Sequence, residues 1–74
     1  MKNLIVNISE FQNGEIIAAY TAAFSDVPGA IIGQSGNARL LQSGNTLIVV
    51  SRPRIDGLLP ECNAPVVDLN WMFN

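Results

Sequence analysis

Histidine is absent from this 74-residue sequence, and cysteine occurs once, as Cys62. Without histidine there is no histidine-based catalytic triad, and without a second cysteine no disulfide forms within the chain. Structural zinc sites draw most of their ligands from these two residue types, so none is expected. The sequence therefore predicts no metal and no cofactor. It indicates a small domain that must be stabilised by close packing or by association with another chain.

Positive charge is scarce as well. Four cations stand against six carboxylates, and the formal net charge is −2. A protein that binds the nucleic-acid backbone usually carries a basic patch. Only Arg52 and Arg54, on either side of Pro53, supply local positive density. Nucleic acid is therefore an unexpected partner, and these two arginines are kept as candidate interaction residues.

Long apolar runs are also missing. None approaches the roughly 20 residues that a helix needs to cross a bilayer. Met1 is followed by one lysine and then by an alternating segment, which differs from a signal peptide. We expect no membrane partner and a location in the cytoplasm or in association with a virion.

The apolar residues that are present, 49% of the total, alternate with polar ones in the pattern of β-strands. Leu4, Val6 and Ile8 share one face of segment 3–11. This segment runs into Asn13-Gly14, which favours a type I′ hairpin turn. Residues 46–51 are rich in β-branched side chains and apolar on both faces, so we expect a strand at the centre of a sheet.

Segment 16–25 fits two structures. Its alanines favour a helix, in which Ile16, Tyr20 and Phe24 would lie on one stripe. The preceding Asn-Gly turn and the scarcity of lysine and glutamate favour a strand, in which the same three residues also share a face. We predict a strand and keep one short helix at 16–25 as the alternative.

The four residues Gln-Ser-Gly-Asn occur twice, beginning at Gln34 and at Gln42. Glycine-containing turn signals recur at short intervals along this part of the chain, which is typical of a small sandwich or barrel. A type II′ turn centred on Gly44-Asn45 would pair Leu41 with Ile48. The same register pairs Leu40 with Val49 and Arg39 with Val50. We therefore interpret both copies as turns.

The first copy also resembles a nucleic-acid motif. The apolar pair Ile31-Ile32 precedes a GxxG loop, similar to the signature of the KH domain family. In that family the loop leads into a helix and clamps the backbone of nucleotides. The resemblance implies a helix after the loop and a nucleic-acid contact within it. The candidate loop residues are Gly33, Gln34, Ser35 and Gly36.

The C-terminal part divides into a connection and a strand. Residues 52–65 hold three of the four prolines and are interpreted as a long connection. Residues 66–73 alternate large apolar side chains with Asp68 and Asn70, which predicts an amphipathic strand. Its apolar face should be covered by the core or by a second subunit. The candidate interaction residues on that face are Leu69, Trp71 and Phe73.

These patterns predict one small domain over residues 1–74. It should be mainly β, an antiparallel sheet, barrel or sandwich of roughly four to six short strands, with α+β as the alternative. The carboxylates are scattered and Cys62 lies beside Glu61, so no enzyme is expected.

For function we expect protein–protein interaction or assembly by a homo-oligomer, as in a phage or mobile-element virion component or an inhibitor of host machinery. The alternatives are a nucleic-acid module with a degenerate KH-like loop and a small-ligand binder that uses the Gly-rich turns.

Overall fold

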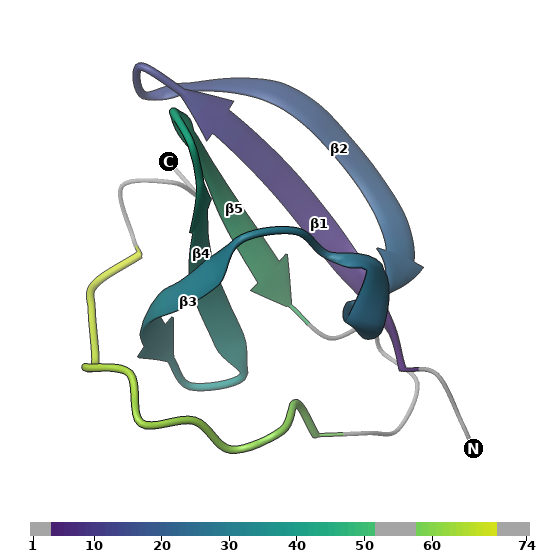
Figure 1. Ribbon diagram of the computed structural model, residues 1–74, viewed down its shortest axis with the longest axis vertical. Helices are drawn as coiled ribbons and strands as arrows, with labels where there is room; N and C mark the ends of the chain where they lie inside the picture. The colour runs from purple at the N-terminus through teal and green to yellow at the C-terminus, as the bar shows by residue number, and fades with distance from the viewer. Residues whose placement is uncertain (1–3, 52–57, 70–74) are drawn as a thin grey trace.

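The computed structural model describes residues 4–51 and 58–69, and it shows five antiparallel strands in one curved, open sheet (Figure 1). The order across the sheet is β2-β1-β5-β4-β3, so β5 is the central strand, as predicted. A strand, and not a helix, forms over most of 16–25, and the mainly β prediction is confirmed. The elements are β1 (Ile5–Gln12), β2 (Glu15–Ala23), a single 3-10 turn η1 (Phe24–Asp26), β3 (Ala30–Ser35), β4 (Ala38–Ser43) and β5 (Thr46–Ser51).

A two-residue turn connects the two strands of each of the three hairpins, β1–β2, β3–β4 and β4–β5. Asn13 and Gly14 both have positive φ, 53° and 80°, as a type I′ turn requires. Gly36 and Gly44 each occupy the first central position of their turns, with φ of 56° and 61°, as in type II′ turns. Both copies of Gln-Ser-Gly-Asn therefore end in hairpin turns, and the predicted pairing of Leu41 with Ile48 is confirmed.

The helix implied by the KH resemblance is not formed. Residues 33–35 belong to β3, Gly36 opens the turn, and Ala38–Ser43 is strand β4. Leu40 and Leu41 are both buried, on opposite faces of the sheet, which suits a strand covered on two sides. The expectation of a loop leading into a helix is therefore wrong.

Apolar side chains cover both faces of the sheet. Consecutive residues such as Ile48 and Val49 point to opposite faces, because side chains alternate along a strand. This explains why β5 is apolar throughout. The first cluster contains Val6, Ile8, Leu41, Ile48, Val50 and Leu59. The second cluster contains Phe11, Leu40, Val49 and Leu69.

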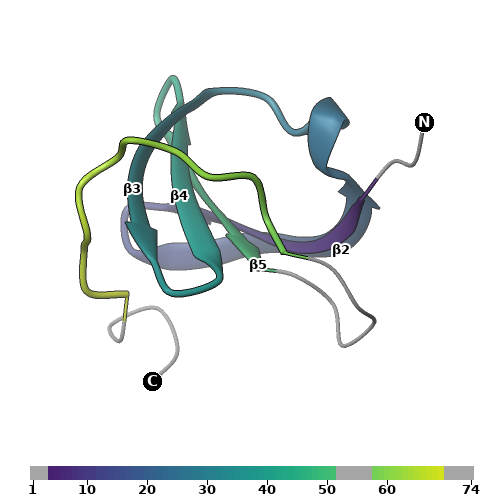
Figure 2. The ribbon, with the colours of Figure 1, turned by 90° about the horizontal axis from the view of Figure 1, so that it is seen from below.

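Segment 58–69 passes from one face of the sheet to the other around the outer edge of β3 (Figure 2). Its first part places Leu59 in the first cluster and its last part places Leu69 in the second. Between them the backbone N–H of Gln34 donates to the carbonyl of Pro65 at 2.9 Å, and the N–H of Val67 donates to the carbonyl of Gln34 at 2.8 Å. The chain thus pairs with the edge of β3 itself.

The strand predicted over 66–73 is wrong in its described part. Val66 makes one isolated parallel bridge to Gln34, and residues 67–69 belong to no strand. Pro65 has no N–H to donate, so the ladder cannot continue toward the start of the segment. The alternation is nevertheless present, because Val67 and Leu69 both pack on the second cluster. Residues 70–73 lie outside the described residues.

Candidate functional site

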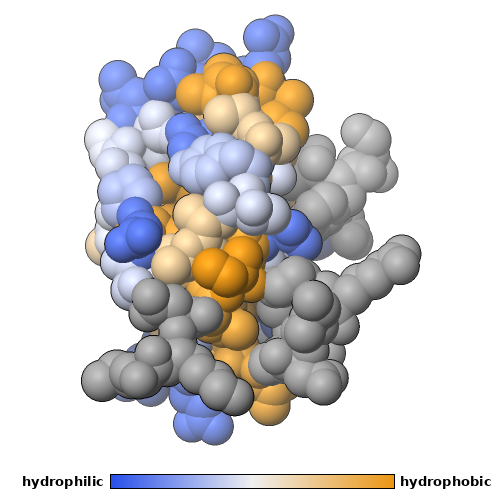
Figure 3. Space-filling model, turned by 90° about the vertical axis from the view of Figure 1, so that its right-hand side faces the viewer, coloured by the Kyte–Doolittle hydropathy of each residue, from blue (hydrophilic) through white to orange (hydrophobic). Residues whose placement is uncertain are grey.

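The edge of the sheet opposite β3 is formed by β2, and it is apolar and exposed. In the described part of the chain β2 pairs only with β1. Ile16 and Ile17 are 58% and 51% exposed, and Tyr20 is 41% exposed. Figure 3 looks at this side of the molecule and shows apolar and pale side chains along its length. We call the exposed surface of residues 15–23 the β2 edge.

The sequence of the β2 edge lacks the features that keep edge strands apart. Such strands usually carry lysine or proline, or are covered by another segment. Residues 15–23 contain no lysine, arginine or proline, and their one charge is Glu15 at the start. A bulge leaves Ile17 without a partner on β1, because Glu10 pairs with Ala18 and Phe11 with Ile16. The β2 edge therefore combines a backbone edge with protruding apolar side chains, which is the arrangement that binds an added strand.

The β3 edge is closed by comparison. Besides the backbone bonds of Gln34, its side-chain Nε2 donates to the carbonyls of Ala64, at 2.8 Å, and Cys62, at 3.3 Å. Arg39, only 6% exposed, donates to the carbonyls of Gly36, at 3.0 Å, and Pro60, at 3.1 Å. The side chains of Gln34 and Arg39 thus hold segment 58–69 against the sheet by hydrogen bonds. The β3 edge is therefore covered at this point, whereas the β2 edge is exposed.

The candidate loop residues Gly33, Gln34, Ser35 and Gly36 lie together at the end of β3 and its turn. A Cβ atom on Gly33 would lie 2.8 Å from Cγ2 of Val67, so only glycine leaves room for segment 58–69 at this point. Gln34 bonds the same segment through its backbone and its side chain. In the structure, Gly33 and Gln34 contact the chain's own C-terminal segment.

Of the other residues predicted from the sequence, only Leu69 lies in the described part of the chain. Leu69 is 3% exposed and belongs to the second cluster. Arg52, Arg54, Trp71 and Phe73 lie outside the described residues. Ile16, Ile17 and Tyr20 were not among the predicted residues, although the absence of lysine and proline from 15–23 could have revealed this surface.

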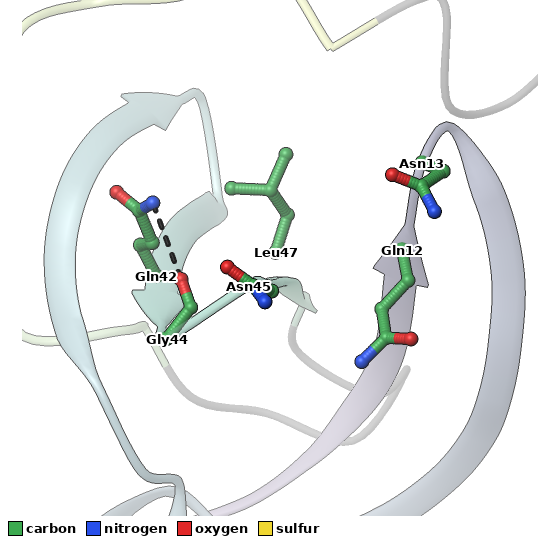
Figure 4. Close-up of a pocket in the computed structure, with 6 residues that line it drawn as sticks. All are labelled: Gln12, Asn13, Gln42, Gly44, Asn45 and Leu47. Carbon is green, nitrogen blue, oxygen red and sulfur yellow. Dashed lines mark hydrogen bonds between the residues drawn. The ribbon is translucent and has the colours of Figure 1, made fainter.

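An open hollow of about 410 Å³ lies between the β1–β2 turn and the β4–β5 turn (Figure 4). The side chain of Gln42 donates to the carbonyl of Gly44 at 3.4 Å, and that of Gln12 donates to the hydroxyl of Thr46 at 3.0 Å. The lining offers neutral amides and no charged group, so it provides hydrogen bonds but no acid–base chemistry. The lining residues are Gln12, Asn13, Gln42, Gly44, Asn45 and Leu47.

Tyr20 on the β2 edge forms a polar contact with β1. Its hydroxyl donates to the carboxylate of Glu10. This hydrogen bond raises the pKa of Tyr20 above its usual value of 10.0, with smaller contributions from desolvation and from the negative charge of Glu10. The bond requires the protonated phenol, and it fixes the side chain on an otherwise exposed strand.

Replacing Glu10 by glutamine should lower the pKa of Tyr20. Because folding raises this pKa, the stabilisation that the phenol provides is complete below the unfolded value near 10 and is lost as pH rises through the folded value. Tyr20 is the sole tyrosine, so its ultraviolet absorbance reports the titration directly. Glu15→Gln is the matched control and should leave the curve in place. Superimposable curves for wild type and Glu10→Gln would show that the contact is not made in solution.

Comparison with protein-family models, with curated proteins and with solved structures finds no match for this chain. Among residues 4–51 and 58–69, no helix is long and apolar enough to cross a membrane. In the same residues no group of three or more histidine, cysteine, aspartate or glutamate side chains is placed to hold a metal ion.

Proposed function

We propose that this protein is a non-enzymatic interaction or assembly domain whose contact surface is the β2 edge. One observation carries the proposal: one edge of the sheet is closed by the chain's own segment 58–69, while the other is apolar and pairs with nothing in the described residues. An exposed edge strand presents unpaired N–H and C=O groups, which bind another strand.

The size of the domain supports the same reading. A chain of this length buries only about 60% of its unfolded surface, so a partner that covers Ile16 and Ile17 adds apolar burial that the fold lacks. The two isoleucines project from a strand in which most of the other residues are alanine. The expected setting, a virion or the host machinery of a phage or mobile element, stays a prediction.

Replacing Ile17 by lysine should abolish association while leaving the fold intact. The lysine places a hydrated charge within the proposed contact, and Ile17 is exposed, so the core is not disturbed. The matched control is Ile32→Lys. Ile32 is also an exposed isoleucine at an irregularity of an edge strand, on the closed β3 edge, and its replacement should leave association unchanged.

Two measurements check this expectation: sedimentation of the purified proteins, and capture of binding proteins from a cell lysate by immobilised wild type and variants. Circular dichroism confirms that each variant is folded. The proposal is supported when a complex forms with wild type and Ile32→Lys but not with Ile17→Lys. It is wrong if every complex survives Ile17→Lys, or if wild type forms no complex in either measurement.

A further inference from the structure

We infer that the β2 edge binds a second copy of this chain, by antiparallel pairing of β2 with β2 about a two-fold axis. The inference rests on the proposed function, because it identifies the partner of the same surface. It joins two five-stranded sheets into one continuous sheet across the dimer. Three features of the described residues favour this arrangement: the first favours a closed dimer, and the other two favour its antiparallel register.

The first feature is the difference between the two edges. Identical chains whose two edges were both open could join head to tail and grow into a filament. Here the backbone of Gln34 on β3 is already hydrogen-bonded to the backbone of Pro65 and Val67. Nearby, the side chain of Arg39 donates to the carbonyl of Pro60. Among the strands of the described residues, β2 is the edge strand left to pair (Figures 1 and 2). Two copies that pair through it use identical surfaces, so the assembly closes at the dimer.

The second feature is the position of charge. Glu15 is the only charged residue of β2 and stands at its first position. Parallel pairing would place the two Glu15 carboxylates side by side, which is unfavourable. Antiparallel pairing centred on Ala19 places each Glu15 opposite Ala23, and roughly 27 Å separates the two carboxylates at about 3.4 Å per residue.

The third feature is the size of the side chains. In the register centred on Ala19, Ile17 lies opposite Thr21 and Ala18 opposite Tyr20. Ile16 lies opposite Ala22 in the same register. Each large side chain therefore faces a small or short one on the other copy, which lets the two strands approach without a clash. At the centre of the register, Ala19 of one copy lies opposite Ala19 of the other, and this residue is exposed.

Cross-linking of single cysteines tests the geometry. The native Cys62 is first replaced by serine, so that each protein carries one thiol. Ala19→Cys should then be joined efficiently into a covalent dimer by a short bis-maleimide, because the two thiols lie beside the two-fold axis. Glu15→Cys, on the same strand and also exposed, should react at least tenfold more slowly because its copies lie at opposite ends.

The outcomes bear differently on this inference and on the proposed function. Dimers through Ala19→Cys that disappear on adding Ile17→Lys support both. Faster cross-linking of Glu15→Cys indicates parallel pairing and overturns the inference. A monomer at every concentration that still captures another protein through the β2 edge overturns the inference and leaves the proposed function standing. A dimer that is insensitive to Ile17→Lys overturns the inference, and it overturns the proposed function as well if every other complex also survives that substitution.

Discussion

Replacing Ile48 by alanine should lower the free energy of unfolding by about 2–5 kcal/mol, the range for deleting a large aliphatic side chain from a core. Ile48 is 1% exposed and lies on the central strand, within the first cluster. Domains are stabilised by only about 0.05–0.15 kcal/mol per residue, so a loss of this size removes much of the total. Chemical denaturation followed by circular dichroism measures the change.

Ile17→Ala is the matched control, because it makes the same chemical change on an exposed strand. Ile17 is 51% exposed, so Ile17→Ala should change the free energy of unfolding of the monomer by no more than about 0.5 kcal/mol. The substitution should instead weaken association. If Ile17→Ala unfolded the monomer and Ile48→Ala did not, the placement of Ile48 in the core and of Ile17 on the exposed edge would be wrong.

Replacing Gly33 by alanine should lower the free energy of unfolding by about 1–3 kcal/mol, the usual cost of forcing an extra group into a packed site. The new Cβ would lie 2.8 and 2.9 Å from the two Cγ atoms of Val67, which is too close for van der Waals contact. The φ of Gly33 is not in the left-handed region, so the cost arises from this clash and not from the backbone.

A double-mutant cycle isolates the clash. Val67→Ala removes both Cγ atoms, so Gly33→Ala should cost almost nothing in that background, and the two changes should couple by about 1 kcal/mol or more. The denaturation midpoints of the four proteins give the coupling. Additive effects would show that segment 58–69 does not lie against β3 as described.

Local turn chemistry and alternation were sufficient to predict most of the strands and their turns, but not the order of the strands across the sheet. Asn13-Gly14 and Gly44-Asn45 fix two turns, because few residues other than glycine and asparagine tolerate positive φ. Once the second turn is placed, the pairing of Leu41 with Ile48 follows by counting. The ambiguous segment 16–25 became a strand because it follows a tight hairpin turn and pairs along β1.

The path of the C-terminal segment could not be predicted in the same way. Alternation correctly placed Val67 and Leu69 on one face, but it gave no sign that they pack beside β3 through a single bridge. That arrangement depends on Gly33, whose missing side chain makes room for Val67 from a distant part of the sequence. Such a contact carries no local signal, and in the sequence Gly33 stands out only as part of the GxxG motif, on which the KH-like alternative rests.

The candidate surface was missed for a related reason. Periodicity identifies apolar residues but not which strand stands at an edge, and strand order is set by long-range pairing. Ile16 and Ile17 looked like ordinary members of a strand until β2 was found at the edge opposite the closed one.

Residue-resolved amide hydrogen exchange at low and high protein concentration tests most directly whether one edge is closed and the other pairs with a second copy. The amides of Gln34 and Val67 should be protected at both concentrations, because their bonds form within one chain. Amides of β2 that point away from β1 should exchange rapidly in the dilute sample and become protected in the concentrated one. Rapid exchange at Gln34 and Val67, or β2 exchange that does not change with concentration, would contradict this account.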